Sequence, residues 1–91
     1  MKEIKDIEVV PSTNEVYCAT SGGLFEVDMG TGTVKRKFTN VDGLLSVQLL
    51  SVKEDDRNRL WIGASDGSIS IYEYQTGTWK YIFDIYFFSH Y

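Results

Sequence analysis

The chain has 91 residues, which is enough for one small domain at most. Its apolar fraction of 43% and charged fraction of 24% are ordinary for a globular protein and argue against disorder. The formal net charge of −4 argues against a nucleic-acid or anionic-membrane surface, because such surfaces need clustered lysine and arginine side chains.

The first half of the chain predicts four short strands joined by tight turns. The strands are expected from residue 4 to Pro11 and at 16–20, 24–28 and 33–39. Pro11 closes the first strand because proline has no N–H to donate to a strand ladder. Gly23 and Gly32 lie in the later turns, where glycine tolerates the positive φ angles that tight hairpins require. We therefore expect one antiparallel meander.

The second half predicts the same meander after a connector at residues 40–44. The pattern restarts at Ser46, and further strands are expected at 60–64, 68–74 and 78–83. An acidic turn containing Asp55 stands where the first half has Pro11, and a carboxylate of this turn is expected to cap turn amides. No segment has sustained helical periodicity, so no helix is predicted.

The two halves are copies of one repeat. Tyr17 and Trp61 are separated by 44 residues, and Gly23 and Gly67 have the same separation. A Thr-Gly-Thr turn at 31–33 returns 45 residues later, which a one-residue insertion explains. A repeat of this length indicates an array of supersecondary units. The expected boundaries are 1–41 for the first repeat, 42–83 for the second and 84–91 for an aromatic tail.

The second repeat predicts a sheet that is apolar on both faces. In the strand at 60–64, Leu60 and Ile62 point one way and Trp61 points the other. A sheet with one wet face should instead alternate apolar and polar residues. Both faces are therefore expected to be covered, and radial stacking of four-stranded sheets, the arrangement of a β-propeller, would cover them.

The chain resembles the two-component regulator propeller repeat. The run Leu-Trp-Ile-Gly-Ala at 60–64, followed by a Gly hairpin and a Thr-Gly turn, is similar to that family's LWIGT pattern. The matching residues in the second copy are Val52, Asp55, Trp61, Gly63, Gly67, Tyr72, Gly77 and Trp79, and the looser matches in the first are Tyr17, Ala19, Gly23, Phe25 and Gly32. Residues 38–44 are similar to the connector between blades.

This resemblance implies an all-β chain of two four-stranded antiparallel propeller-type blades. It also implies a relation to the periplasmic ligand-sensing domains of hybrid two-component histidine kinases, whose ligands include glycan-type molecules. Rings need about 4–8 blades, so we expect self-association through the blade faces to complete or cover the pair. Aromatic residues of the tail could also cover an exposed face. A self-assembling structural or protein-interaction module without a small-molecule ligand is the alternative, and a propeller lyase or hydrolase fragment is a third.

The residues assigned to the repeat have packing and turn roles. They are Tyr17, Gly23, Phe25, Trp61, Gly63, Asp66, Gly67, Ile69, Ile71 and Gly77. Trp79 lies on the outermost strand, where it could contact a ligand or partner or simply pack. We expect no catalytic residue, no cofactor and no metal, and no partnership with nucleic acid or membrane.

Several motifs could suggest chemistry, and each has a simpler interpretation. Residues 63–67 match G-x-S-x-G, but that motif needs a strand-to-helix turn, and a strand is expected to follow. His90 has no expected partners, and the single cysteine, Cys18, is interpreted as a small buried hydrophobe. The basic run at 35–37 is interpreted as a solvated strand edge. The charged N-terminal residues do not resemble a signal peptide, so the periplasm is expected from the resemblance only.

Overall fold

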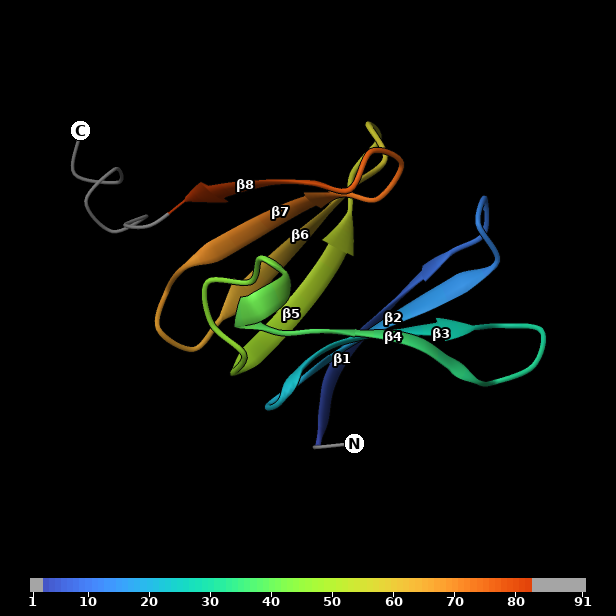
Figure 1. Ribbon diagram of the computed structural model, residues 1–91, viewed down its shortest axis with the longest axis horizontal. Coiled ribbons are helices and arrows are strands. Elements are labelled where there is room, and N and C mark those ends of the chain that lie inside the picture. Colours follow the sequence, from blue (N-terminus) through green and yellow to red (C-terminus); the bar gives the residue numbers. More distant parts are fainter. Residues whose placement is uncertain (1–2, 83–91) are drawn as a thin grey trace.

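The computed structural model describes residues 3–82, and over that range the chain forms eight strands and one 3-10 helix. The elements are β1 (Ile4–Val10), β2 (Glu15–Thr20), β3 (Gly23–Asp28), β4 (Val34–Phe38), η1 (Asn40–Asp42), β5 (Leu49–Glu54), β6 (Arg59–Ala64), β7 (Ile69–Glu73) and β8 (Thr78–Ile82). They form two four-stranded antiparallel sheets with strand orders β1-β2-β3-β4 and β5-β6-β7-β8 (Figure 1). The expectation of two four-stranded antiparallel sheets is confirmed.

The internal repeat extends to the backbone conformation of the turns. Asn14 and Asn58, which are 44 residues apart, both adopt positive φ angles, of 60° and 61°, in the first turn of each sheet. Asparagine is one of the few residue types other than glycine that tolerates this region. Gly23 and Gly67, the next pair in the repeat, also have positive φ. The two sheets are thus the same supersecondary unit built twice.

The expectation that the chain has no helix is wrong in the connector. Residues Asn40–Asp42 form a single 3-10 turn, η1, between the two sheets (Figure 1). The Asp42 carboxylate accepts a hydrogen bond of 2.9 Å from the backbone N–H of Thr39, which closes the turn at its start. A three-residue turn is too short to produce a periodic pattern of apolar residues, so periodicity could not reveal it.

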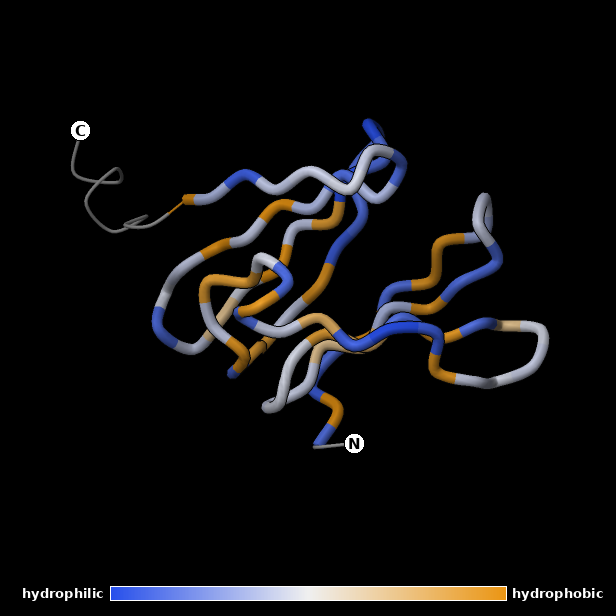
Figure 2. The backbone as a smooth tube through the Cα atoms, in the orientation of Figure 1, coloured by the Kyte–Doolittle hydropathy of each residue, from blue (hydrophilic) through white to orange (hydrophobic). Residues whose placement is uncertain are grey.

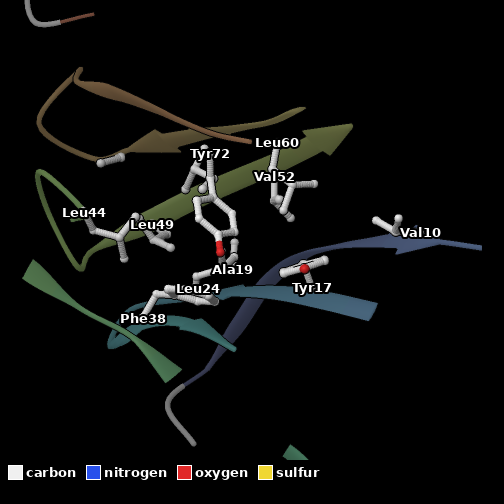
Figure 3. Packing of buried hydrophobic residues seen from close by; sticks show 12 residues of the cluster. Val10, Tyr17, Ala19, Leu24, Phe38, Leu44, Leu49, Val52, Leu60 and Tyr72 are labelled. Atoms are coloured by element: carbon white, nitrogen blue, oxygen red, sulfur yellow. The ribbon is translucent and has the colours of Figure 1, made fainter. Parts of the chain in front are cut away.

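The hydrophobic core lies between the two sheets. Side chains from β2 and β3 point toward side chains from β5, β6 and β7 (Figure 3), and apolar positions recur along the strands of both sheets (Figure 2). The core residues are Val10, Tyr17, Ala19, Leu24, Phe38, Leu44, Leu49, Val52, Leu60, Ile62, Ala64 and Tyr72. Removal of these side chains from water is the main contribution to the stability of the pair.

Carboxylates of β1 hold the edge of the second sheet. The backbone N–H of Val52 donates to Asp6 Oδ2 at 3.1 Å, and that of Glu54 donates to Glu8 Oε2 at 2.7 Å. These N–H groups belong to β5, an edge strand, and would otherwise be open to pairing with another chain. The contact therefore fixes the position of the second sheet on the first.

Each sheet has a second face that points away from the other sheet. On the first sheet this surface is here called the valine face, and its apolar residues are Ile7, Val9, Val16, Cys18, Phe25, Val27 and Val34, with Lys37 beside Phe25. On the second sheet the corresponding surface is here called the Trp61 face, which contains Trp61, Gly63, Ile69, Ile71 and Ile82, with Lys53 and Lys80 on the edge strands. On the valine face, 51% of Ile7, 44% of Val9 and 49% of Val34 remain exposed. This exposure is high for apolar residues that share one face of a sheet.

Candidate functional site

A polar pocket of about 340 Å³ opens between the two sheets. Its lining consists of Thr13, Glu15, Tyr17, Glu26, Lys35, Arg36 and Tyr74. Strand register places the central residues side by side, because Tyr17 pairs with Glu26 and Glu26 pairs with Arg36 across β2, β3 and β4. The pocket thus combines carboxylates, cations and tyrosine hydroxyls at one end of the apolar core.

Glu26 is the centre of the hydrogen-bonded network in this pocket. The Tyr17 hydroxyl donates to Glu26 Oε2 at 2.6 Å, and Arg36 Nε donates to Glu26 Oε1 at 3.2 Å. Glu26 is only 4% exposed, and these two donors supply hydrogen bonds that burial would otherwise deny its carboxylate oxygens. Arg36 also donates from Nη2 to the Tyr72 hydroxyl on the second sheet, at 3.3 Å. The network therefore connects the two sheets.

Glu15 and Lys35 form a second ion pair in the same wall. A β-bulge in β4 displaces the pairing register next to Glu26, which lets Lys35 reach Glu15 on β2. Burial raises the pKa of the Glu15 carboxyl, but the hydrogen bond and charge of Lys35 outweigh burial and leave that pKa below its usual value. The pKa of Tyr17 is raised, first by burial and then by the adjacent Glu26 carboxylate.

Tyr74 supplies the wall of the pocket on the second sheet. Its hydroxyl donates to Glu54 Oε2 at 2.6 Å and lies 3.0 Å from Asn58 Oδ1. Burial, followed by the hydrogen bond to Glu54, raises the pKa of this tyrosine. Within residues 3–82, every buried side-chain nitrogen or oxygen atom has a hydrogen-bond partner. A solute would bind here by exchanging hydrogen bonds with these groups.

Of the glycines assigned to turns, Gly67 and Gly77 lie between strands, and Gly23 is the first residue of β3, directly after the β2–β3 turn. Gly23, Gly67 and Gly77 have φ angles of 123°, 88° and 76°, a region that favours glycine. At Gly23 a Cβ atom would also lie 2.5 Å from the carbonyl oxygen of Phe38. Asp66 closes the β6–β7 hairpin, since its Oδ1 accepts bonds from the Ser68 N–H at 3.0 Å and the Ser68 hydroxyl at 2.6 Å.

The residues assigned to packing are divided between different faces. Tyr17 is fully buried between the sheets. Phe25 lies on the valine face, with the Lys37 ammonium 5.5 Å from its ring centre. Gly63, Ile69 and Ile71 lie on the Trp61 face with Trp61, whose indole N–H donates to Asp55 at 2.8 Å.

Trp79 packs into an aromatic cluster whose other members, Phe38 and Tyr72, contact the pocket residue Arg36. Its ring centre lies 4.6 Å from that of Tyr72 and 5.9 Å from that of Phe38. A Cβ atom on Gly43 would meet its ring at 2.6 Å, so the connector covers part of the indole. The side chain is half-buried, and its suggested contact with a ligand or partner stays a prediction.

Three motifs from the sequence have clear structural positions. Ser65 of the G-x-S-x-G match lies in the β6–β7 hairpin, between two strands. Asp55 caps its own turn as expected, accepting a bond of 2.8 Å from the N–H of Arg57. The basic run at 35–37 lies on edge strand β4, but its first two residues pair with buried carboxylates instead of facing solvent alone.

Sequence reasoning missed the pocket, although a signal was present. Glu15 and Glu26 stand inside predicted strands, and Glu15 shares a strand face with Tyr17 because successive side chains alternate. Charged residues on the face that carries a core tyrosine indicate buried partners. The expected tail contacts and His90 lie outside the described residues.

Comparison of the chain with protein-family models, with curated proteins and with solved structures found no match. The resemblance to the two-component regulator propeller repeat thus rests on the motif residues alone. Among the described residues, His, Cys, Asp and Glu side chains form no group of three that could hold a metal ion. No helix within residues 3–82 is long and apolar enough to span a membrane.

Proposed function

We propose that the chain is a non-catalytic β-propeller repeat module, a fragment or relative of the extracytoplasmic ligand-sensing domain of a two-component regulatory system. The main support for this proposal is which side of each sheet faces the other. Tyr17 corresponds to Trp61 in the repeat and Cys18 corresponds to Ile62. The first sheet buries its Tyr17 side against the Ile62 side of the second, so non-equivalent faces meet.

This orientation favours a propeller over a two-fold sandwich. A pseudo-two-fold pair would bury the same face of both repeats, as an isologous contact does. Successive blades of a propeller instead meet front to back around the ring. The burial of Tyr17 and Ile62 in one core supports the second arrangement. Ser65 supports the non-catalytic part, since a hairpin does not provide the strand-to-helix turn of a nucleophile elbow.

The pocket between the sheets is the proposed ligand site, and a glycan-type ligand suits its walls. Saccharide hydroxyls both donate and accept, which matches a lining of carboxylates, cations and tyrosine hydroxyls. The test is an NMR titration of the ¹⁵N-labelled chain with neutral and uronic-acid-containing disaccharides. We expect saturable shifts at the amides of Thr13, Glu15 and Lys35, and the absence of shifts for both sugar classes would refute the proposed ligand.

A matched pair of variants sharpens this titration. Arg36→Met removes a donor from the pocket wall and should weaken saccharide binding at least tenfold. Lys80→Met changes the repeat-equivalent residue, which is on the outward side of the second sheet, and should leave binding unchanged. Equal weakening by both variants would show that binding takes place elsewhere.

The exposed valine face favours the alternative function, a self-assembling structural or protein-interaction module. Val9 and Val34 are edge members of a row of four valines that crosses all strands of the first sheet. Burial of such a surface would stabilise an assembly of copies. Light scattering coupled to size-exclusion chromatography tests this, and we expect a mass above the monomer that rises with concentration. A monomer at every concentration would refute self-assembly.

A further inference from the structure

The repeat relates the faces of the two sheets to each other. The valine face and the Trp61 face do not correspond in the repeat, but each corresponds to the inner face of the other sheet, which is buried inside the chain. One row on the inner face of the first sheet contains Glu8, Tyr17, Glu26 and Arg36, and its equivalent on the Trp61 face contains Lys53, Trp61, Ile71 and Lys80. The Trp61 face therefore corresponds, in the second repeat, to the inner face of the first sheet, which packs on the second sheet.

The same relation holds for the other pair of faces. One row on the inner face of the second sheet contains Glu54, Leu60, Tyr72 and Trp79, and its equivalent on the valine face contains Val9, Val16, Val27 and Val34. Inside the chain these two types of row touch, because Arg36 donates to the Tyr72 hydroxyl and the Glu54 N–H donates to Glu8. The interface between the two sheets thus indicates that a Trp61 face and a valine face would fit each other.

The differences between the repeats are matched across the two faces. The internal interface places polar Glu26 and Arg36 opposite Tyr72, whose hydroxyl accepts a bond from the guanidinium. At the positions equivalent to Glu26 and Tyr72 the outward faces have Ile71 and Val27, both apolar. The position of Arg36 is taken by Lys80, which is exposed on the edge strand β8. At the centre of the row a polar group therefore meets a polar partner in the internal contact, and an apolar group would meet an apolar one between copies.

From this correspondence we propose that copies of the chain associate head to tail, with the Trp61 face of one copy packed on the valine face of the next. This inference rests on the proposed self-assembly and adds its geometry and partner, a second copy of the same chain. Such a contact is heterologous, because two different faces meet. A chain of copies therefore has a free Trp61 face at one end and a free valine face at the other. Rings form if the rotation closes and open stacks form if it does not.

Two variants, each blocking one face, test the arrangement. The double variant Val9→Glu, Val34→Glu places carboxylates on the valine face at positions that are 44% and 49% exposed. Ile69→Glu places a carboxylate on the Trp61 face, where Ile69 is half-buried. Each charge would have to lose its water in the contact, which is costly without a partner. Val41→Glu, at a connector residue that is 95% exposed, is the control.

In a head-to-tail contact each blocked variant should be a monomer by itself, and an equimolar mixture should form a heterodimer. The valine-blocked copy still offers its Trp61 face, and the Ile69→Glu copy still offers its valine face. Light scattering should give twice the chain mass for the mixture, while the Val41→Glu control assembles like the wild type. Thermal unfolding of each variant checks folding, and Ile69→Thr replaces Ile69→Glu should the latter not fold.

The other outcomes overturn the arrangement in distinguishable ways. A blocked variant that still dimerises by itself shows that equivalent faces meet. A mixture that stays monomeric while the wild type assembles rejects a contact between these two faces. A monomeric wild type removes self-assembly itself, including the case in which aromatic residues 84–91 of the same chain occupy the Trp61 face.

Discussion

We expect Asp55→Asn to lower the free energy of unfolding by about 3 kcal/mol. The Asp55 carboxylate accepts four hydrogen bonds: Oδ1 accepts from the N–H groups of Arg57 and Arg59, at 2.8 and 3.1 Å, and Oδ2 accepts from Arg59 Nε and Trp61 Nε1, at 2.7 and 2.8 Å. Asparagine can keep the first two bonds, but its amide nitrogen turns donors toward the other two. Each bond to a charged acceptor contributes about 1.5–3 kcal/mol, and the lower value suits this partly exposed turn.

The effect of Asp55→Asn should depend on pH. Burial raises the pKa of the Asp55 carboxyl, but the hydrogen bonds from Trp61, Arg57 and Arg59 outweigh burial and hold that pKa well below its usual range. A depressed pKa in the folded state gives stability that is present above the unfolded pKa, at about pH 4, and is lost as the pH falls further. The difference in stability between wild type and variant should therefore shrink below about pH 4.

Urea unfolding followed by tryptophan fluorescence at pH 7 and pH 3 measures both effects. Asp56→Asn, at the exposed neighbouring position, removes the same charge without these four bonds and serves as the control. We expect the control to change the free energy of unfolding by less than about 0.5 kcal/mol. An Asp55→Asn variant as stable as Asp56→Asn, or equally destabilised at both pH values, would refute the reasoning.

Four further predictions concern the connector, a turn, the pocket and the buried cysteine. Gly43→Ala should cost about 3 kcal/mol of stability, because its φ is 132° and a Cβ would lie 2.6 Å from the Trp79 ring. Gly77→Ala, with φ 76° and open space, should cost about 1 kcal/mol. Glu26→Gln should cost about 2 kcal/mol in the same urea assay, because it weakens the bonds from its tyrosine and arginine partners. Cys18, 7% exposed and with its pKa raised by burial, should react with a thiol reagent at least tenfold faster in urea than in buffer.

The strands and their pairing could be predicted because local signals and the repeat agreed. Glycines at 23, 67 and 77 marked turns that need positive φ, and the alternation of Leu60, Trp61 and Ile62 marked a strand that is apolar on both sides. The repeat also identified equivalent residues correctly, since the asparagines of the two first turns share one backbone conformation. These features depend on neighbours in the chain, which a sequence displays directly.

The buried charges of the pocket left a signal in the sequence, but the geometry of the pocket could not be predicted because it depends on contacts between distant residues. Lys35 reaches Glu15 only because a bulge shifts the register of β4, and no residue in that strand signals a bulge. Arg36 meets Tyr72 across the gap between the sheets, 36 residues away in the chain. The repeat alone does not show which side of the first sheet meets the second.

Buried polar groups between the two sheets oppose their replacement by a second copy. The contact between the sheets of one chain and the proposed contact between copies therefore need not compete. An ion pair such as Arg36 with Glu26 adds little net stability, but breaking one is costly because a charge loses its partner. If the Trp61 face of another copy displaced the inner face of the first sheet, the Tyr72 hydroxyl would lose its bond from Arg36, and Ile71 and Lys80 would stand in the places of Glu26 and Arg36. The row of four valines on the valine face has no such polar group to satisfy. A face of either sheet therefore discriminates between the partner sheet of its own chain and a sheet of another copy, because the wrong partner would leave polar groups without hydrogen bonds.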